Sequence, residues 1–295
     1  MNLKGVASAL TLTAIAVSLT LTTVVFAPLP LMLLRRNGGR TSFVVGSILA
    51  SAALIWFATP MVVGAFLGAV ILTFVLTESE SQNLGYTSSV FVTLLVLVGF
   101  AAIATGYAIE HYGFDPVIFA RNQLTLALTQ MNLPTGVTVD KEGLIKQLPS
   151  ALIILIVLSI WANSIIVPKM EKLFGWAPIY LNHTFVSGEF RSWKLPDSFV
   201  WLALLSAAGT FLPIEPEWTH WVCANLFNVV VMLYFFQGLA VVVDFFAVKK
   251  ISALWRMVAY IFIFSQLFLM VAFLGFADLW VGFRNRTKTD KSAVV

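Results

Sequence analysis

Charged residues are scarce in this chain, and their scarcity excludes an ordinary water-soluble domain. Lys, Arg, Asp and Glu together make up 11% of the 295 residues, whereas a soluble domain has about 25%. Hydrophobic residues make up 59%, and the mean hydropathy is +0.92. Apolar runs recur that are about 20 residues long, the length of a helix that crosses a lipid bilayer. The sequence therefore predicts an all-α fold, a polytopic bundle of transmembrane helices.

Cysteine and histidine are also rare, which removes several kinds of functional site. The single cysteine, Cys223, excludes an intrachain disulfide and a cysteine metal cluster. The three histidines, His111, His183 and His220, lack the spacing of a metal site. Phosphate-binding glycine loops and serine-nucleophile motifs are missing as well. We therefore expect no metal, no cofactor and no catalytic centre. The net charge of +4, without a basic stripe, does not indicate nucleic-acid binding.

Eight apolar segments are long enough to enter a membrane, so the lipid bilayer is the first expected partner. We predict one integral membrane domain over 1–286 and a disordered tail over 287–295. The predicted spans cover about 7–34, 41–58, 61–77, 86–109, 148–167, 198–212, 218–248 and 253–281.

Short turns and small residues organise the first half of the chain. Pro28 is expected to kink or unwind the end of the first span, and a basic turn follows at 35–40. A polar loop with two carboxylates is predicted at 78–85. Gly64 and Gly68 form a small-xxx-small pattern, which allows another helix to approach closely.

Two long connections have compositions suited to the membrane interface. In 113–147, Pro116 opens a predicted amphipathic helix, and Asp140 is expected to cap a second short helix that ends near Leu148. In 168–197, aromatic residues alternate with lysine and arginine, which is typical of the lipid headgroup level. The candidates for docking another membrane protein are Trp176, Tyr180, Arg191, Trp193 and Lys194.

Polar side chains inside the last two apolar segments are the candidate ligand-binding residues. Such groups are costly in hydrocarbon, so they need a partner or a function. On a helix, Gln237 and Asp244 share a face whereas Asn228 lies nearly opposite, so this segment should contact several neighbours. For the asparagines and glutamines two interpretations remain open: hydrogen bonds that join helices, or a polar pocket for a small ligand or ion. For the two aspartates, the alternative to a pocket is that they reach the membrane interface or pair with Arg or Lys there. The candidates are Asn225, Asn228, Gln237, Asp244, Gln266 and Asp278.

The C-terminal third also carries motifs that are similar to those of a known family. They read FRSWKLPD from residue 190, YFFQGLAVV from 234 and LGFADLWVGFR from 274. On these motifs the chain resembles the YybS-like family of bacterial inner-membrane proteins, a domain-of-unknown-function family. Gly282 departs from the family's closing motif, where an acidic residue is common.

The resemblance implies a multi-pass protein of the bacterial inner membrane. It also implies distant kinship with the substrate-binding S components of energy-coupling-factor (ECF) vitamin transporters and with the rod-shape scaffold protein MreD. Two functions are therefore expected: a small-molecule-binding or transport component, or a non-catalytic scaffold of a membrane complex. Fold-level kinship alone does not decide between them.

Overall fold

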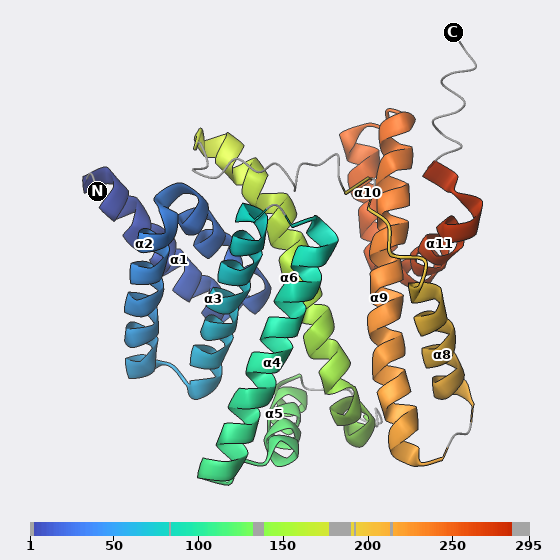
Figure 1. The fold of residues 1–295 in the computed structure, drawn as a ribbon, viewed down its shortest axis with the longest axis horizontal. Coiled ribbons are helices and arrows are strands. Elements are labelled where there is room, and N and C mark those ends of the chain that lie inside the picture. The colour runs from blue at the N-terminus through green and yellow to red at the C-terminus, as the bar shows by residue number, and fades with distance from the viewer. Residues whose placement is uncertain are drawn as a thin grey trace. The chain divides into compact units, whose positions relative to one another are not determined.

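The computed structural model describes residues 3–82, 84–131, 139–176, 190–191, 193–212 and 215–284 (Figure 1). Within these ranges every regular element is helical, which confirms the predicted all-α class. Contacts between residues divide the chain into two compact units, and helix α6 (Lys141–Phe174) contributes residues to both. The first unit holds Met1–Lys141 and Leu155–Val186, and the second holds Glu142–Ile154 and Ser187–Val295.

Several of the described helices are long and apolar enough to cross a membrane. Five qualify singly, and a pair bent by 99° is a sixth candidate. Two more apolar helices, Ser8–Thr22 and Phe199–Phe211, fall short of the roughly 20 residues that a crossing requires. The multi-pass class is thus confirmed, whereas eight separate spans stay a prediction. The single candidates are Val24–Phe57, Pro60–Ser81, Tyr86–Tyr112, Lys141–Phe174 and Glu217–Val248, and the bent pair is Ala253–Ser265 with Phe268–Val281.

The first predicted span is divided between two helices of the first unit. Helix α1 (Leu3–Thr22) ends before the short 3-10 helix η1 (Val24–Phe26), and α2 (Pro28–Phe57) begins at Pro28. Proline has no N–H to continue a helix but suits the first helical position. The unwinding expected at Pro28 is therefore confirmed, but 28–34 belong to the next helix, so one span over 7–34 is wrong.

Helix α2 bends where the sequence predicted a basic turn. Gly39 has a φ of 78° and a ψ of −179° inside the helix, a conformation that favours glycine because it has no Cβ. Helix α3 (Pro60–Ser81) likewise continues through Glu78 and Glu80. The charges assigned to two loops thus lie on helices. The first unit's core includes fully buried residues of these helices and of α6: Leu31, Phe66, Leu76 and Ile160.

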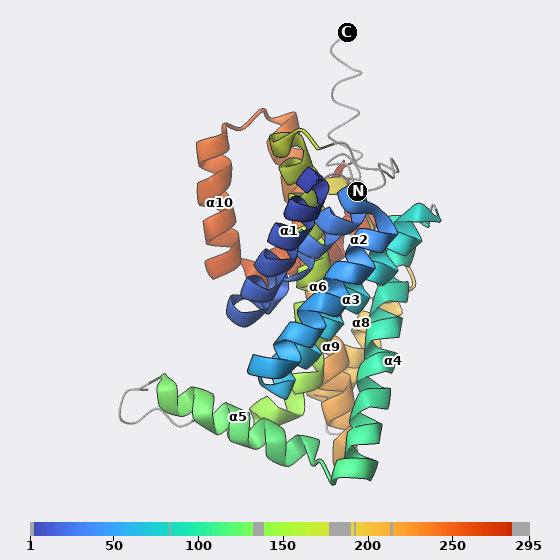
Figure 2. The same cartoon turned by 90° about the vertical axis from the view of Figure 1, so that its left-hand side faces the viewer.

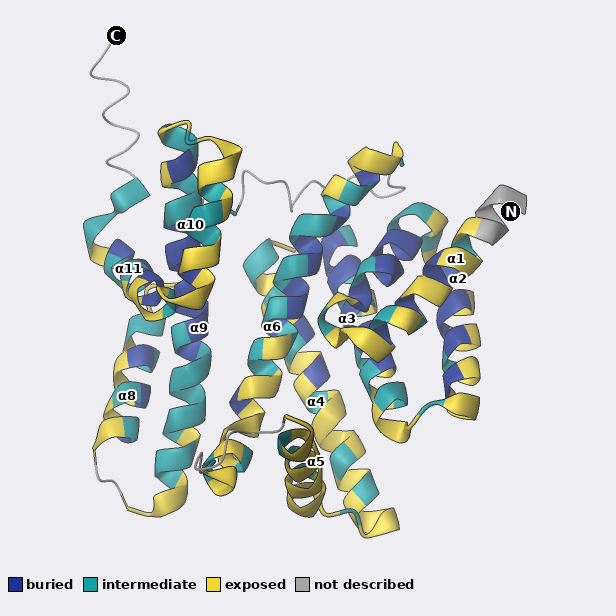
Figure 3. Cartoon of the chain, turned by 180° about the vertical axis from the view of Figure 1, so that it is seen from behind, coloured by how far each residue is buried: buried dark blue, intermediate teal, exposed yellow. Residues whose placement is uncertain are grey.

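The first helix predicted within 113–147 is present, and the second is not separate. Helix α4 (Tyr86–Tyr112) leads to α5 (Pro116–Gln130), whose first turn is capped by the Asp115 carboxylate. Figure 2 shows α5 extending sideways from the end of α4; none of its residues is buried, and most are exposed (Figure 3). The short helix predicted to end near Leu148 continues without interruption as α6, so the predicted boundary there is wrong.

Helix α9 (Glu217–Val248) is the central helix of the second unit. It packs against α8 (Phe199–Phe211) and α11 (Phe268–Val281). In Figure 1, α8 runs beside the lower half of α9, and α11 lies across its upper half. Helix α10 (Ala253–Ser265) meets α11 at a sharp break, so the predicted continuous span over 253–281 is wrong. Every residue of α9 from Met232 to Ala240 is buried, so this part of the helix is covered on all sides. This agrees with the prediction that α9 contacts several neighbours.

Candidate functional site

Helices α9 and α11 touch through their backbones, and two glycines make this possible. A Cβ atom added to Gly238 would lie 1.8 Å from the carbonyl oxygen of Val271. One added to Gly275 would lie 2.0 Å from the carbonyl oxygen of Tyr234. Only residues without a side chain fit at such a crossing. By contrast, no neighbour among the described residues comes within 4 Å of a Cβ placed at Gly64 or Gly68. The close approach predicted there is not observed.

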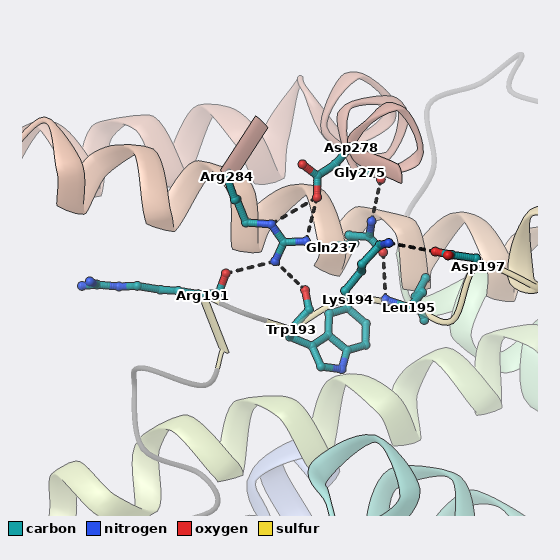
Figure 4. A network of polar contacts seen from close by, with 9 residues as sticks. All are labelled: Arg191, Trp193, Lys194, Leu195, Asp197, Gln237, Gly275, Asp278 and Arg284. Carbon is teal, nitrogen blue, oxygen red and sulfur yellow. Dashed lines mark hydrogen bonds and ion pairs between the residues drawn. The ribbon is translucent and has the colours of Figure 1, made fainter. Parts of the chain in front are cut away.

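Gln237 uses this crossing to join three segments. Its side chain is fully buried. Its Oε1 accepts a hydrogen bond from the Leu195 N–H at 3.0 Å, and its Nε2 donates one to the Gly275 carbonyl at 2.9 Å (Figure 4). Both amide groups are thus satisfied away from water, as a buried polar group requires. Gln237 therefore connects α9 to α11 and to the segment that precedes α8.

Asp278 and Arg284 form a buried ion pair beside this amide. Helix α11 ends at Gly282, whose φ is 59°, and the chain turns so that Arg284 points back toward α11 (Figure 4). Its Nη2 and Nε lie 2.6 and 3.1 Å from the Asp278 Oδ2. Its Nη1 donates to the carbonyls of Trp193 and Arg191, at 2.7 and 3.0 Å. The guanidinium thus neutralises a carboxylate and holds the backbone before α8.

A half-open pocket of about 420 Å³ lies between the C-terminal part of α9 and the end of α11. Asp244 and Arg284 line it among apolar side chains. Its volume falls within the roughly 300–1,000 Å³ of small-molecule sites. Of the six predicted ligand-binding residues, Asp244 alone lines this pocket, whereas Gln237 and Asp278 belong to the network next to it. The apolar lining residues are Val241, Val242, Phe245, Phe246, Leu274 and Phe283.

Asn225 and Asn228 lie on another part of α9 and contact the beginning of α6. Asn225 Oδ1 accepts from the Ser150 N–H at 2.9 Å, and its Nδ2 donates to the Lys146 carbonyl at 2.8 Å. These two backbone groups are the i and i+4 partners of a regular helix. Asn228 adds a longer contact, 3.4 Å, to the Ser150 hydroxyl. Both asparagines therefore join helices outside the pocket.

Gln266 is exposed at the break between α10 and α11, so the structure does not bring it to the pocket. The docking candidates are also dispersed. Trp176 is partly buried in the first unit. Arg191 and Lys194 are exposed in the second unit, where Trp193 is half-buried. Tyr180 lies outside the described residues. The described part of 168–197 therefore does not form one surface.

The first unit contains a cluster of ion pairs that the sequence analysis did not identify as a site. Arg36 lies 3.0 Å from Glu171 and 3.8 Å from Glu80. Arg35 lies 3.1 Å from Glu78, which also pairs with Arg40. One feature of the sequence could have predicted this cluster: acidic and basic residues both occur at the ends of strongly apolar segments. It was missed because the charges were assigned to solvated turns.

Together, the apolar helices and their internal polar contacts define the class: a multi-pass helical membrane protein. Its family follows from comparison with known sequences. The chain belongs to the family described as predicted membrane protein (DUF2232), whose model matches residues 6–279. Among curated proteins and solved structures, none matches the chain.

Proposed function

We propose that this chain is a small-molecule-binding or transport component of a membrane, with its ligand site in the α9–α11 pocket. The observation that carries the proposal is the pocket itself, about 420 Å³ with Asp244 and Arg284 among apolar walls. Apolar walls with a few oriented polar groups are characteristic of ligand sites. Ionisable residues inside a membrane usually face the bundle interior or a cavity rather than lipid, and they often mark ligand or ion sites.

The surrounding network would keep the site in a defined shape. Arg284 is held on one side by Asp278 and on the other by two backbone carbonyls. Its position is therefore determined before a ligand arrives, which lowers the ordering cost of binding. The ligand would have an apolar body and a polar group that can reach Asp244 or Arg284. The proposed kinship with ECF S components supports a small-molecule ligand.

The proposal includes the finer membrane arrangement predicted from sequence. All eight apolar segments would enter the bilayer, with α1, α8, α10 and α11 entering as short or broken helices that pack against longer ones. Discontinuous helices are tolerated in membranes where protein covers their ends. The location would be the bacterial inner membrane, and no catalytic role is proposed.

A ligand screen with a blocked pocket tests the proposal. Purified protein in nanodiscs would be heated with vitamins, nucleosides and lipid precursors, and a ligand at 100 times its Kd should stabilise the fold by about 2.7 kcal/mol. Leu274→Trp should fill the pocket and abolish the shift. Leu269→Trp is the matched control, because Leu269 lies on the same helix, is 70% exposed and does not line the pocket. A hit that survives Leu274→Trp, or no hit at all, would refute the pocket assignment.

A scaffold function is the second candidate, favoured by the anchored segment before α8. Arg284 and Gln237 hold its backbone, and Arg191 and Lys194 extend from it into exposed positions. A rigid backbone with exposed basic side chains suits docking to an acidic partner. Crosslinking at position 194 should then capture one defined envelope protein, and Arg191→Glu should abolish the capture. Capture unaffected by Arg191→Glu would argue against this surface.

A further inference from the structure

The turn between α9 and α10 concentrates positive charge that the chain does not balance. The stretch 245–277 has three basic residues and no acidic one. The basic residues are Lys249 and Lys250, which are exposed, and Arg256, which is partly buried. None of the described carboxylates forms an ion pair with any of the three. Their charges are therefore available to an anion from outside the chain.

The backbone at Lys250 is one that lysine rarely adopts. Lys250 follows the last turn of α9 in a left-handed conformation, with a φ of 51°. The Ile251 N–H then bonds back across the helix end to the Phe246 carbonyl at 3.0 Å. Glycine usually occupies the left-handed position of such an ending, because it has no Cβ. Since the Lys250 side chain is exposed, its charge is what this position gains over glycine.

Two further groups at this turn suit a phosphate. The Nε of Arg256 donates to the Ile251 carbonyl at 2.7 Å, which holds the guanidinium beside the turn. Its two Nη groups have no hydrogen-bond partner among the described residues. Ser252, the residue before α10, makes no side-chain hydrogen bond to the helix, so the first N–H groups of α10 are also available to an anion. A guanidinium beside a helix N-terminus is well suited to phosphate oxygens.

An apolar groove of about 470 Å³ continues from these charges along α10, which lies beside the upper part of α9 in Figure 1. Its lining residues recur every three or four positions, so they form one face of the helix. From the first to the last of them the helix rises about 17 Å, close to the roughly 15 Å of hydrocarbon in one leaflet of a bilayer. Met257, Ile261 and Phe264 are each more than half exposed. The lining residues are Ala253, Arg256, Met257, Tyr260, Ile261 and Phe264.

We propose that the α9–α10 turn and the α10 groove form a binding site for an anionic phospholipid. The phosphate contacts Lys249, Lys250 and Arg256, and one acyl chain lies in the groove. A free phosphate would use the charges but leave the apolar face uncovered. A zwitterionic lipid would bring its own cation beside three unbalanced ones, whereas an anionic lipid matches both charge and length. Trp255, 66% exposed at the same turn, is typical of the headgroup level. This site does not depend on the ligand pocket proposed above.

Native mass spectrometry of the purified protein tests the proposal by titration with two lipids that have the same acyl chains. Phosphatidylglycerol should bind at least about tenfold more tightly than phosphatidylcholine. Lys249→Gln with Lys250→Gln should weaken phosphatidylglycerol binding about 30-fold, since each basic side chain near an anionic headgroup contributes about fivefold. Lys169→Gln with Lys172→Gln is the matched control, because it removes two exposed lysines near the end of α6. Equal affinity for the two lipids, or an equal loss in the control, would overturn the proposal.

Lys250→Gly separates the charge of this turn from its structural role. Glycine relieves the left-handed backbone, so the thermal midpoint should rise while phosphatidylglycerol binding falls about fivefold. Lower stability with unchanged binding would overturn the proposal. Inorganic phosphate should not displace the lipid, and full displacement would assign the charges to a free anion instead. The same spectra report the number of copies. A dimer that forms without lipid and is dissociated by Ile261→Asp would place a second chain on the groove and also overturn the proposal.

Discussion

The two units bury charge in different ways: the second pairs one carboxylate with one guanidinium, whereas the first gathers several of each. In the second unit one guanidinium, Arg284, meets one carboxylate, Asp278, and its remaining donors bind backbone carbonyls. In the first unit one guanidinium, Arg36, serves two carboxylates. A one-to-one pair depends on a single partner, so its removal leaves an uncompensated buried charge. In the first unit Arg36 and Glu78 each contact two opposite charges, so either loses only part of its pairing when one partner is removed.

The largest expected effect comes from the helix crossing that supports the second unit's network. Gly275→Ala would place a methyl group 2.0 Å from the Tyr234 carbonyl oxygen, so α9 and α11 would have to separate. We expect a loss of more than about 4 kcal/mol, the exceptional range for one substitution. Thermal unfolding in nanodiscs measures it. Gly68→Ala in α3, which meets no described neighbour, is the control and should be nearly neutral. Similar stability for the two variants would contradict the crossing.

Removing the guanidinium of the second unit should have the next largest effect. Arg284→Ala leaves Asp278, whose side chain is 3% exposed, without its counter-ion. Breaking a buried pair from one side costs about 3 kcal/mol. Asp278→Asn combined with Arg284→Gln should recover part of this loss, because the charge is removed from both sides. A thermal shift that is no smaller in the double variant would show that charge is not the cause.

A smaller effect is expected where α9 meets α6. Asn225→Leu removes the amide that hydrogen-bonds to the Lys146 carbonyl and the Ser150 N–H. Losing two hydrogen bonds, one part-buried and one exposed, costs about 1–2 kcal/mol. Asn228→Leu removes one contact of 3.4 Å and is the milder comparison. Hydrogen exchange of the first turns of α6 should rise in Asn225→Leu and change little in Asn228→Leu. Equal exchange in both would contradict the role of Asn225.

The smallest effect is expected at an exposed pair. Lys194 lies 2.8 Å from Asp197, and the two side chains are 44% and 81% exposed. Exposed ion pairs contribute about 0–1 kcal/mol and weaken with salt. Lys194→Ala should therefore change thermal stability by less than about 1 kcal/mol. A larger loss would mean that the Lys194–Asp197 pair contributes more to stability than its exposure indicates.

Much of the second unit's polar chemistry could be identified from residue type alone. Asn225, Gln237 and Asp278 stand out because polar groups are rare in apolar helices, and each has a defined partner. The partners could not be predicted, since they are mostly backbone groups: the carbonyls of Lys146 and Gly275 and the N–H of Leu195. Backbone donors and acceptors occur at every residue, so sequence cannot select among them. Gln266, predicted by the same reasoning, is exposed at a helix break instead.

The errors in the first unit have a common physical cause. Charged residues were assigned to loops because charge is costly inside a membrane, yet α2 and α3 carry theirs on helices. Buried charge is tolerated when opposite charges from other helices meet it. Arg36 and Glu171 are far apart in the chain, so their pairing depends on how α2 and α6 pack. A local pattern contains no information about that packing.

The sequence by itself determined two things: that the chain suits lipid rather than water, and that it is a multi-pass helical protein. Long apolar runs with few charges can satisfy their backbone groups in lipid only as helices, so composition was enough to predict a multi-pass helical protein. Tertiary structure alone decided which helices break, that Gly238 and Gly275 rather than Gly64 and Gly68 make the close contact, and which charges share a partner. These features depend on distances between segments remote in sequence, which only the packed chain defines.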